Sequence, residues 1–303
     1  MSKRRKKVKP VCIPKYDEPE EDEEELEPPV VEKCDDEPDR TVQLAAKLKE
    51  FKSIAAPEPF VLKCLQNSII DEISCNSSAI AGAVAPRVKV RRYLKGLDLE
   101  RADPDYIKEL FAQRHATELA FSSASEGVPL TVEFIKELHR IIIDDLYPNG
   151  GEFRTRRVML PGCPKEPSLP EDIEIRLRAL LESRLLNDRD IPIWERVERF
   201  HLEFEDIHPF NEGNGRIGFL LIAYQLIQEG YPPAEIFYPD CVEYYRAFDV
   251  YYLQKDDTAM MNFFIRIIER SVDRYLEVYR RYNENMNSVK RLNRRKRRKV
   301  ASR

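Results

Sequence analysis

Apolar residues along most of the chain recur with a helical period. Between residues 61 and 73 they occupy positions 61, 62, 65, 69, 70 and 73, which predicts an amphipathic helix. Comparable patterns predict helices over 132–143, 170–186 and 194–207, and a long closing helix over 258–285. The pattern therefore indicates a mainly helical fold, and His139 and His201, which lie on two of these helices, are expected to be structural.

One segment departs from the helical period. Residues 152–162 (E-F-R-T-R-R-V-M-L-P-G) alternate in a strand-like way after the turn signal Asn149-Gly150-Gly151. Pro161-Gly162 closes the segment. We expect a short β-hairpin over 152–162.

The two ends of the chain consist of charge blocks without apolar periodicity. Residues 3–9 and 290–299 are basic, and residues 17–27 are acidic. Like charges repel and stay solvated, so we expect both ends to be disordered. Thr41 is a suitable N-cap for the first helix. The expected organisation is a charged tail, a folded domain and a basic tail, over residues 1–40, 41–285 and 286–303.

Composition constrains the compartment. The 303 residues carry a net charge of −4, and the six cysteines show no C-x-x-C pair, which indicates free thiols. The start has no apolar leader, and no apolar run approaches the roughly 18 residues of a membrane span. We expect a cytoplasmic or nuclear protein without membrane contact. The basic blocks 3–9 and 294–299 suit nuclear import, nucleic-acid or anionic-surface contact, or no partner at all.

The most distinctive stretch is 208–219, which reads H-P-F-N-E-G-N-G-R-I-G-F and precedes an apolar helical run. Gly213 and Gly215 let the backbone turn and approach a ligand closely. The helix start offers free N–H groups that suit phosphate, and Arg216 adds a forked cation. Glu212 is the hard oxygen ligand that Mg²⁺ prefers, and His208 is placed to take a proton.

These residues resemble the core motif of the Fic family, H-P-F-x-[D/E]-G-N-G-R-x-x-R. Eight specified positions match in order from His208 to Arg216, while Phe219 replaces the final arginine. The resemblance implies an all-α, Fic-type helical bundle with a small β-hairpin flap near the active site. It also implies a protein adenylyltransferase, a nucleotidyltransferase that moves AMP from ATP to a Ser, Thr or Tyr hydroxyl of a target protein.

The resemblance assigns roles within the motif. His208 is the catalytic base, and Glu212 holds Mg²⁺ on the phosphates of ATP. Nucleotide binding falls to Gly213, Asn214, Gly215 and Arg216. Removing a positioned base typically slows such a step about 10²–10⁴-fold.

Two further regions carry resemblance-based roles. Phe153-Arg154 is similar to the entry of the family's flap, which places the target segment, and Arg156 and Arg157 follow on it. For Arg156 and Arg157 the alternative, that they lie on a plain surface hairpin without a role in target binding, stays equally open. Tyr244 and Tyr245 lie where the family has a Tyr-Tyr segment beside the adenine, and core aromatics are the alternative.

The family's inhibitory helix, with the pattern [S/T]-x-x-x-E-[G/N], is expected at residues 74–82. Ser77 and Gly82 match, but Ala81 stands at the glutamate position. A second match, Ser122 to Gly127 with Glu126 at the glutamate position, is rejected, because the family places a further helical region, here 104–121, after the inhibitory helix. In the family that glutamate pairs with the arginine that Phe219 replaces. The double loss implies no autoinhibition of the usual kind and no glutamate-dependent removal of AMP.

The missing arginine leaves alternatives open. A charge-assisted hydrogen bond is worth about 1.5–3 kcal/mol, so ATP is expected to bind roughly 10- to 100-fold more weakly. The enzyme could instead transfer a different nucleotide-derived phosphate group, or the chain could be a degenerate Fic scaffold. The implied partner is a protein substrate with a modifiable hydroxyl, and the chain is left open as a monomer or a homodimer.

Overall fold

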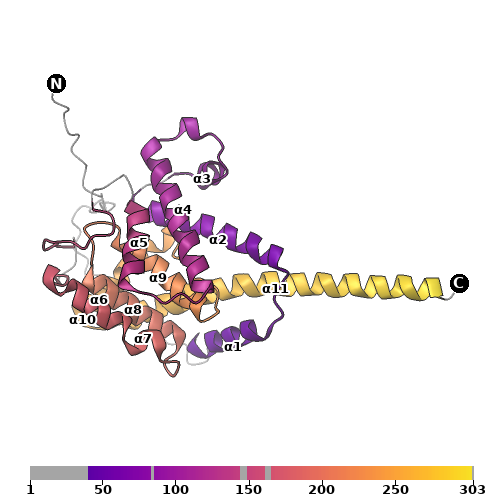
Figure 1. The fold of residues 1–303 in the computed structure, drawn as a ribbon. Helices are drawn as coiled ribbons and strands as arrows, with labels where there is room; N and C mark the ends of the chain where they lie inside the picture. The colour runs from indigo at the N-terminus through magenta and orange to yellow at the C-terminus, as the bar shows by residue number, and fades with distance from the viewer. Residues whose placement is uncertain (1–39, 83–84, 144–148, 161–164, 302–303) are drawn as a thin grey trace, which may run out of the picture.

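The computed structural model describes residues 40–82, 85–143, 149–160 and 165–301. Within them every regular element is helical, and the helices gather into one body from which the end of the last helix projects (Figure 1). The expected all-α class is confirmed. The elements, in order, are α1 (Arg40–Ser53), α2 (Pro59–Ile80), α3 (Arg87–Leu94), η1 (Leu99–Arg101), α4 (Pro104–Ser125), α5 (Val132–Ile143), η2 (Pro170–Asp172), α6 (Ile173–Leu181), α7 (Arg184–Asn187), α8 (Ile193–Ile207), α9 (Asn214–Gln228), η3 (Tyr238–Asp240), α10 (Cys241–Gln254) and α11 (Thr258–Ala301).

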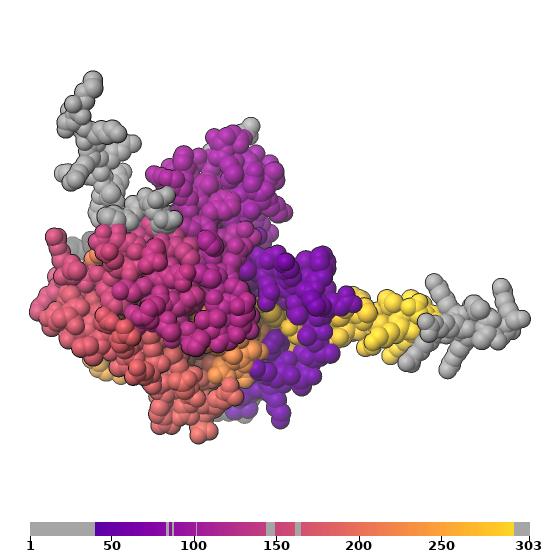
Figure 2. All heavy atoms as spheres, in the orientation of Figure 1, coloured from indigo at the N-terminus to yellow at the C-terminus, as the bar shows by residue number. Residues whose placement is uncertain are grey.

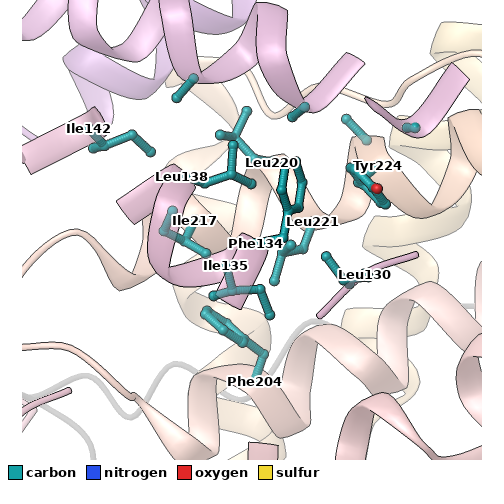
Figure 3. Close-up of a cluster of buried hydrophobic side chains, with 14 of the residues drawn as sticks. Leu130, Phe134, Ile135, Leu138, Ile142, Phe204, Ile217, Leu220, Leu221 and Tyr224 are labelled. Atoms are coloured by element: carbon teal, nitrogen blue, oxygen red, sulfur yellow. The ribbon is translucent and has the colours of Figure 1, made fainter. Parts of the chain in front are cut away.

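The core is built around α9, which is apolar on all sides because it lies between two clusters. One side, including Ile217, Leu220 and Tyr224, packs against α4, α5 and α8 (Figure 3). The other side, including Phe219 and Ile222, packs against α1, α10 and α11. The start of α9 is thereby held rigidly from both sides, which fixes the loop that precedes it.

That loop begins where α8 ends. Pro209 follows His208, and a residue before proline is disfavoured in the α region, so the helix stops there. His208 takes the left-handed conformation (φ 46°, ψ 64°), and its N–H donates to the Phe204 carbonyl at 3.0 Å. The α8–α9 hairpin therefore presents residues 208–213 at one end of the core.

The last helix is longer than its pattern predicts. α11 runs to Ala301 rather than ending at residue 285, so the part described beyond 285 is helical and not a disordered tail. The physical reason lies in composition, because residues 240–303 contain neither Gly nor Pro, and Lys and Arg favour helices. The exposed segment 287–293 extends away from the body (Figures 1 and 2).

The expected β-hairpin is not formed within the described part of residues 152–162. Residues 152–160 carry no strand and run as irregular chain. The Arg154 N–H donates to the Pro209 carbonyl at 3.0 Å, so it is paired with the motif loop rather than with a second strand. The closing turn at 161–162 lies outside the described residues.

The other predicted helices lie near their expected places. The 61–73 helix is part of α2, whose last turns include the expected inhibitory region and end at Ala81 as the C-cap. The 104–121 region lies within α4, and the 170–186 pattern is divided into η2, α6 and α7. Among the described residues no helix has the length and apolarity to cross a bilayer.

Candidate active site

The motif loop makes a tight turn before α9. Gly213 has a φ of 80°, a left-handed value that favours glycine. A Cβ there would also lie 3.1 Å from Ile143 Cδ1, so a larger residue would push against α5. The first N–H groups of α9 have no intrahelical acceptor and lie at the positive end of its dipole. At Gly215 a Cβ would meet no atom within 4 Å, which leaves open space beside these donors.

Asn214 holds the loop closed. Its Oδ1 accepts from the Phe210 N–H at 2.9 Å, and its Nδ2 donates to the Phe210 carbonyl at 2.8 Å. Asn214 is only 3% exposed. The Asn214 side chain therefore clamps the loop backbone, and what the residue offers to an anion is its N–H at the helix start.

His139, on α5, packs against the loop and holds its backbone. Its ring stacks on Phe210, with centroids 3.7 Å apart and planes 5° from parallel. Nδ1 accepts from the Gly151 N–H at 2.8 Å, so Nε2 carries the proton and donates to the Glu212 carbonyl at 3.0 Å. Burial lowers the pKa of His139 to about 4, which keeps it neutral. His139 is a structural histidine, as its helix position predicted.

Arg154 is a buried clamp rather than a target-binding residue. The residue is 2% exposed. Nε donates to the His208 carbonyl at 2.7 Å, and Nη2 donates to the carbonyls of Ser168 and Ile207. The expected role on the flap is corrected, because a guanidinium turned into the protein faces no target. It fixes the backbone of the residue that would act as base.

His208 lies at the mouth of the loop with its side chain 16% exposed. Its Nδ1 faces Glu205 Oε2 at 3.6 Å, one helical turn earlier on α8. The Glu205 side chain is 11% exposed. The His208 ring therefore faces a carboxylate with Nδ1 and stays partly open to solvent. This arrangement suits a group that takes a proton.

Arg216 is held by an acid that the motif did not indicate. Its Nη1 donates to Glu109 Oε1 at 2.8 Å, and the two side chains are 9% and 20% exposed. Glu109 comes from α4, more than 100 residues earlier in the chain. Burial raises the pKa of Glu109, and the Coulombic attraction of Arg216 opposes this rise. The forked cation at the start of α9 is thus already paired with one carboxylate.

Glu212 is exposed, and the described residues contain no group of three acidic, His or Cys side chains with metal-ligand spacing. A protein cage for a metal is therefore absent from that part of the chain. A single exposed carboxylate suits Mg²⁺, which typically keeps waters and is held by one or two carboxylates together with substrate phosphates.

Tyr244 and Tyr245, the candidate contacts for the adenine ring, differ in exposure. Tyr244 is 3% exposed, and its hydroxyl lies 2.8 Å from His201 Nε2 within an aromatic cluster that includes Phe219. For Tyr244 the core alternative is correct, since a buried ring cannot stack on a ligand. Tyr245 is 52% exposed and stays a candidate.

Phe219, one of the two departures from the family pattern, shares a small cavity with α2. It lines this cavity of about 10 Å³, with room for at most about one water, together with Ser77, which matches the inhibitory pattern near the end of α2. Glu126, the rejected alternative, caps α4 beside Val128, whose carbonyl binds Tyr224 and Gln228 at the far end of α9. The assignment of the inhibitory helix to residues 74–82 stays a prediction.

The flap residues differ in exposure. Phe153 packs on Phe210 at 5.7 Å and so belongs to the support of the loop. Arg156 and Arg157 are exposed, and Arg157 lies 3.9 Å from Glu166. Their role in target binding stays a prediction.

Sequence reasoning did not assign roles to Glu109, Glu205 or the loop-supporting side of His139. Glu205 had a usable signal, because it lies three residues before His208 on the same helix. Glu109 had none, since only the packing of α4 on α9 brings it to Arg216.

The segment that carries the motif loop is similar to known proteins. The Fic/DOC family model matches residues 129–226, which include the loop. The chain is 31% identical over 153 residues to the protein adenylyltransferase Fic of Nematostella vectensis and 31% identical over 154 residues to that of Aedes aegypti. Each alignment covers 50% of this chain, but only 34% and 29% of the relatives, so the chain matches about a third of their length.

Solved structures show the same fold. A Fic domain containing signaling protein from Bacteroides thetaiotaomicron aligns with a TM-score of 0.70 at 23% identity, covering 80% of this chain and 97% of that one. Fic-1 from C. elegans (residues 134–508) aligns with a TM-score of 0.69 at 22% identity, covering 80% and 72%. At such identities the likeness speaks for the fold alone.

Proposed function

We propose that this Fic-domain chain is a protein adenylyltransferase that moves AMP from ATP to a Ser, Thr or Tyr hydroxyl of a target protein. One observation carries the proposal: a single rigid loop joins an imidazole, His208, to a helix start with a glycine turn and an arginine. A phosphate chain bound at the helix start lies within the same loop as the group that would take the proton.

The proposed step needs positioning and a base. The target hydroxyl oxygen attacks the α-phosphorus, and the bond from that phosphorus to the oxygen bridging to the β-phosphorus breaks. Pyrophosphate leaves with the bond electrons, and the hydroxyl proton passes to His208. The N–H groups of Gly213 to Arg216 and the Arg216 guanidinium would stabilise the phosphate oxygens.

Mg²⁺ fits the residues present. Glu212 supplies one exposed carboxylate, and the remaining ligands would be phosphate oxygens and water. When bound, the ion would neutralise phosphate charge. The Glu212 backbone is anchored by His139, so its side chain starts from a fixed point on the loop.

Phe219 supports an alternative in which the enzyme uses a nucleotide substrate other than ATP. Its buried ring puts apolar surface where the family pattern has a second arginine. A γ-phosphate would lack that cation, so another nucleotide-linked phosphate donor is the alternative substrate. A degenerate Fic scaffold would transfer nothing.

Intact-mass analysis tests these options together. The protein is incubated with Mg²⁺ and ATP, and separately with other nucleotide donors. We expect a gain of one AMP with ATP, absent in His208→Ala. A different added mass would identify the alternative donor, and no added mass with any donor, on the protein or on lysate proteins, would favour the scaffold.

For the basic segments 3–9 and 294–299 we propose a role in nuclear targeting, supported by their composition alone. A reporter fused to either segment should accumulate in nuclei. A wholly cytosolic reporter would contradict this proposal.

A further inference from the structure

We propose that Glu205 is a positioning residue for His208: it orients the imidazole through Nδ1 and leaves Nε2 to take the proton of the target hydroxyl. This inference rests on the proposed transferase function. It adds a residue outside the motif, placed by the last turn of α8.

The first support is the contact itself. Glu205 and His208 are three residues apart at the end of one helix, and Oε2 lies 3.6 Å from Nδ1. The side chains are 11% and 16% exposed. Nδ1 is buried without a hydrogen-bond partner in the described part of the chain, and so is Glu205 Oε1. Catalytic hydrogen bonds are often long before substrate binds and shorten in the complex.

The second support is the space that α9 leaves for this carboxylate. Gly218 lies inside α9, where glycine is unfavourable for a helix. A Cβ at that position would come within 2.5 Å of Glu205 Oε1 and 2.9 Å of His201 Cε1. Any larger residue would therefore displace the acid. Gly218 therefore lets the Glu205 carboxylate and the His201 ring pack against the backbone of α9.

The third support is the charge of the neighbouring groups. His201 is buried, and burial lowers its pKa, so it stays neutral. Its Nε2 is 2.8 Å from the Tyr244 hydroxyl. Burial also raises the pKa of Tyr244 well above its usual value, which keeps that hydroxyl protonated. Neither group supplies a positive charge to Glu205. The imidazolium that forms on His208 during transfer is the cation that this carboxylate is placed to stabilise.

The resulting proton balance is simple. Before reaction the neutral His208 ring carries its proton on Nδ1, directed to Glu205. The hydroxyl proton arrives at Nε2, and the ring becomes an imidazolium while Glu205 remains a carboxylate. After the product leaves, the Nε2 proton returns to solvent. A carboxylate in this place selects the tautomer and fixes the ring direction.

The test compares Glu205→Gln with Glu203→Gln, a matched change on the same helix at a residue that pairs with Arg176 on α6. For Glu205→Gln we expect kcat to fall about 10²-fold with an unchanged KM for ATP, because the ring is misplaced and the phosphate site is not. Glu203→Gln should keep wild-type kcat. In the His208→Ala background Glu205→Gln should cause no further loss. An unchanged kcat in Glu205→Gln, within about twofold, would overturn the proposal.

A second readout does not depend on turnover. The chain has four histidines, and His208→Ala identifies the His208 signals in ¹⁵N NMR. At slightly alkaline pH the wild-type ring should be protonated on Nδ1, and Glu205→Gln should shift protons to Nε2. If the wild type transfers no nucleotide, the transferase proposal fails. The spectrum still shows whether Glu205 sets the tautomer of His208. A wild-type ring protonated on Nε2 would refute the role of Glu205.

Discussion

The ion pair between Glu109 and Arg216 leads to a specific prediction, because a phosphate at the start of α9 must share the arginine with a carboxylate. The change is Glu109→Gln, which removes the negative charge and keeps the size of the side chain. We expect it to strengthen the binding of a non-hydrolysable ATP analogue. Two negative groups on one guanidinium repel each other, and the substitution removes one of them.

The magnitude follows from the geometry. The contact is 2.8 Å long between side chains that are 9% and 20% exposed. A hydrogen bond to a charged group is worth about 1.5–3 kcal/mol, so releasing Arg216 corresponds to an affinity gain of about 10- to 100-fold. Burial raises the pKa of Glu109 despite the arginine, so desolvation outweighs the attraction within the pair.

Isothermal titration at fixed ionic strength measures the effect. Glu118→Gln is the matched control, since Glu118 lies on α4 and pairs with Arg114 instead. The control should bind the analogue as the wild type does. Weaker binding by Glu109→Gln would refute the reasoning, because it would mean that Glu109 holds Arg216 in its phosphate-binding position.

Three further outcomes follow from the site. Arg154→Ala should destabilise the protein by about 3 kcal/mol in urea unfolding, because it leaves several buried carbonyls unpaired, and a change below about 1 kcal/mol would contradict the clamp. The pKa of His139 is about 4 in the folded protein against an ordinary 6.5, so the free energy of unfolding should be highest above pH 6.5 and fall by up to about 3 kcal/mol as the pH drops towards 4. His139→Gln should flatten that pH dependence, and an equally steep curve in the variant would contradict the assignment to His139. Ala81→Glu should leave transfer activity unchanged, because position 219 holds a phenylalanine rather than a cation; strong inhibition would show another partner for the acid.

The motif loop was predictable because its conformation is set locally. Gly213 takes the left-handed turn that its residue type favours, and His208 ends its helix because a proline follows. The helical class was also readable, since apolar periods of 3.6 residues persist along the chain.

Roles that depend on packing were not predictable. Arg154 was expected on a target-binding flap, and Tyr244 was expected either beside the adenine or in the core, and the fold turns both inward. Glu109 meets Arg216 only because α4 packs on α9, and no local pattern links them. The end of α11 was missed for a different reason, because charge repulsion suggested disorder where helix propensity and the absence of Gly and Pro prevail.

The most direct test of the account is the fate of label from two forms of ATP. The protein is incubated with Mg²⁺ and ATP labelled at the α-phosphate, and in parallel with ATP labelled at the γ-phosphate. We predict that the α-label becomes covalently attached to protein, that the γ-label does not, and that His208→Ala attaches neither. Attachment of the γ-label, or α-labelling that persists in His208→Ala, would contradict the proposal that this loop transfers AMP with His208 as its base.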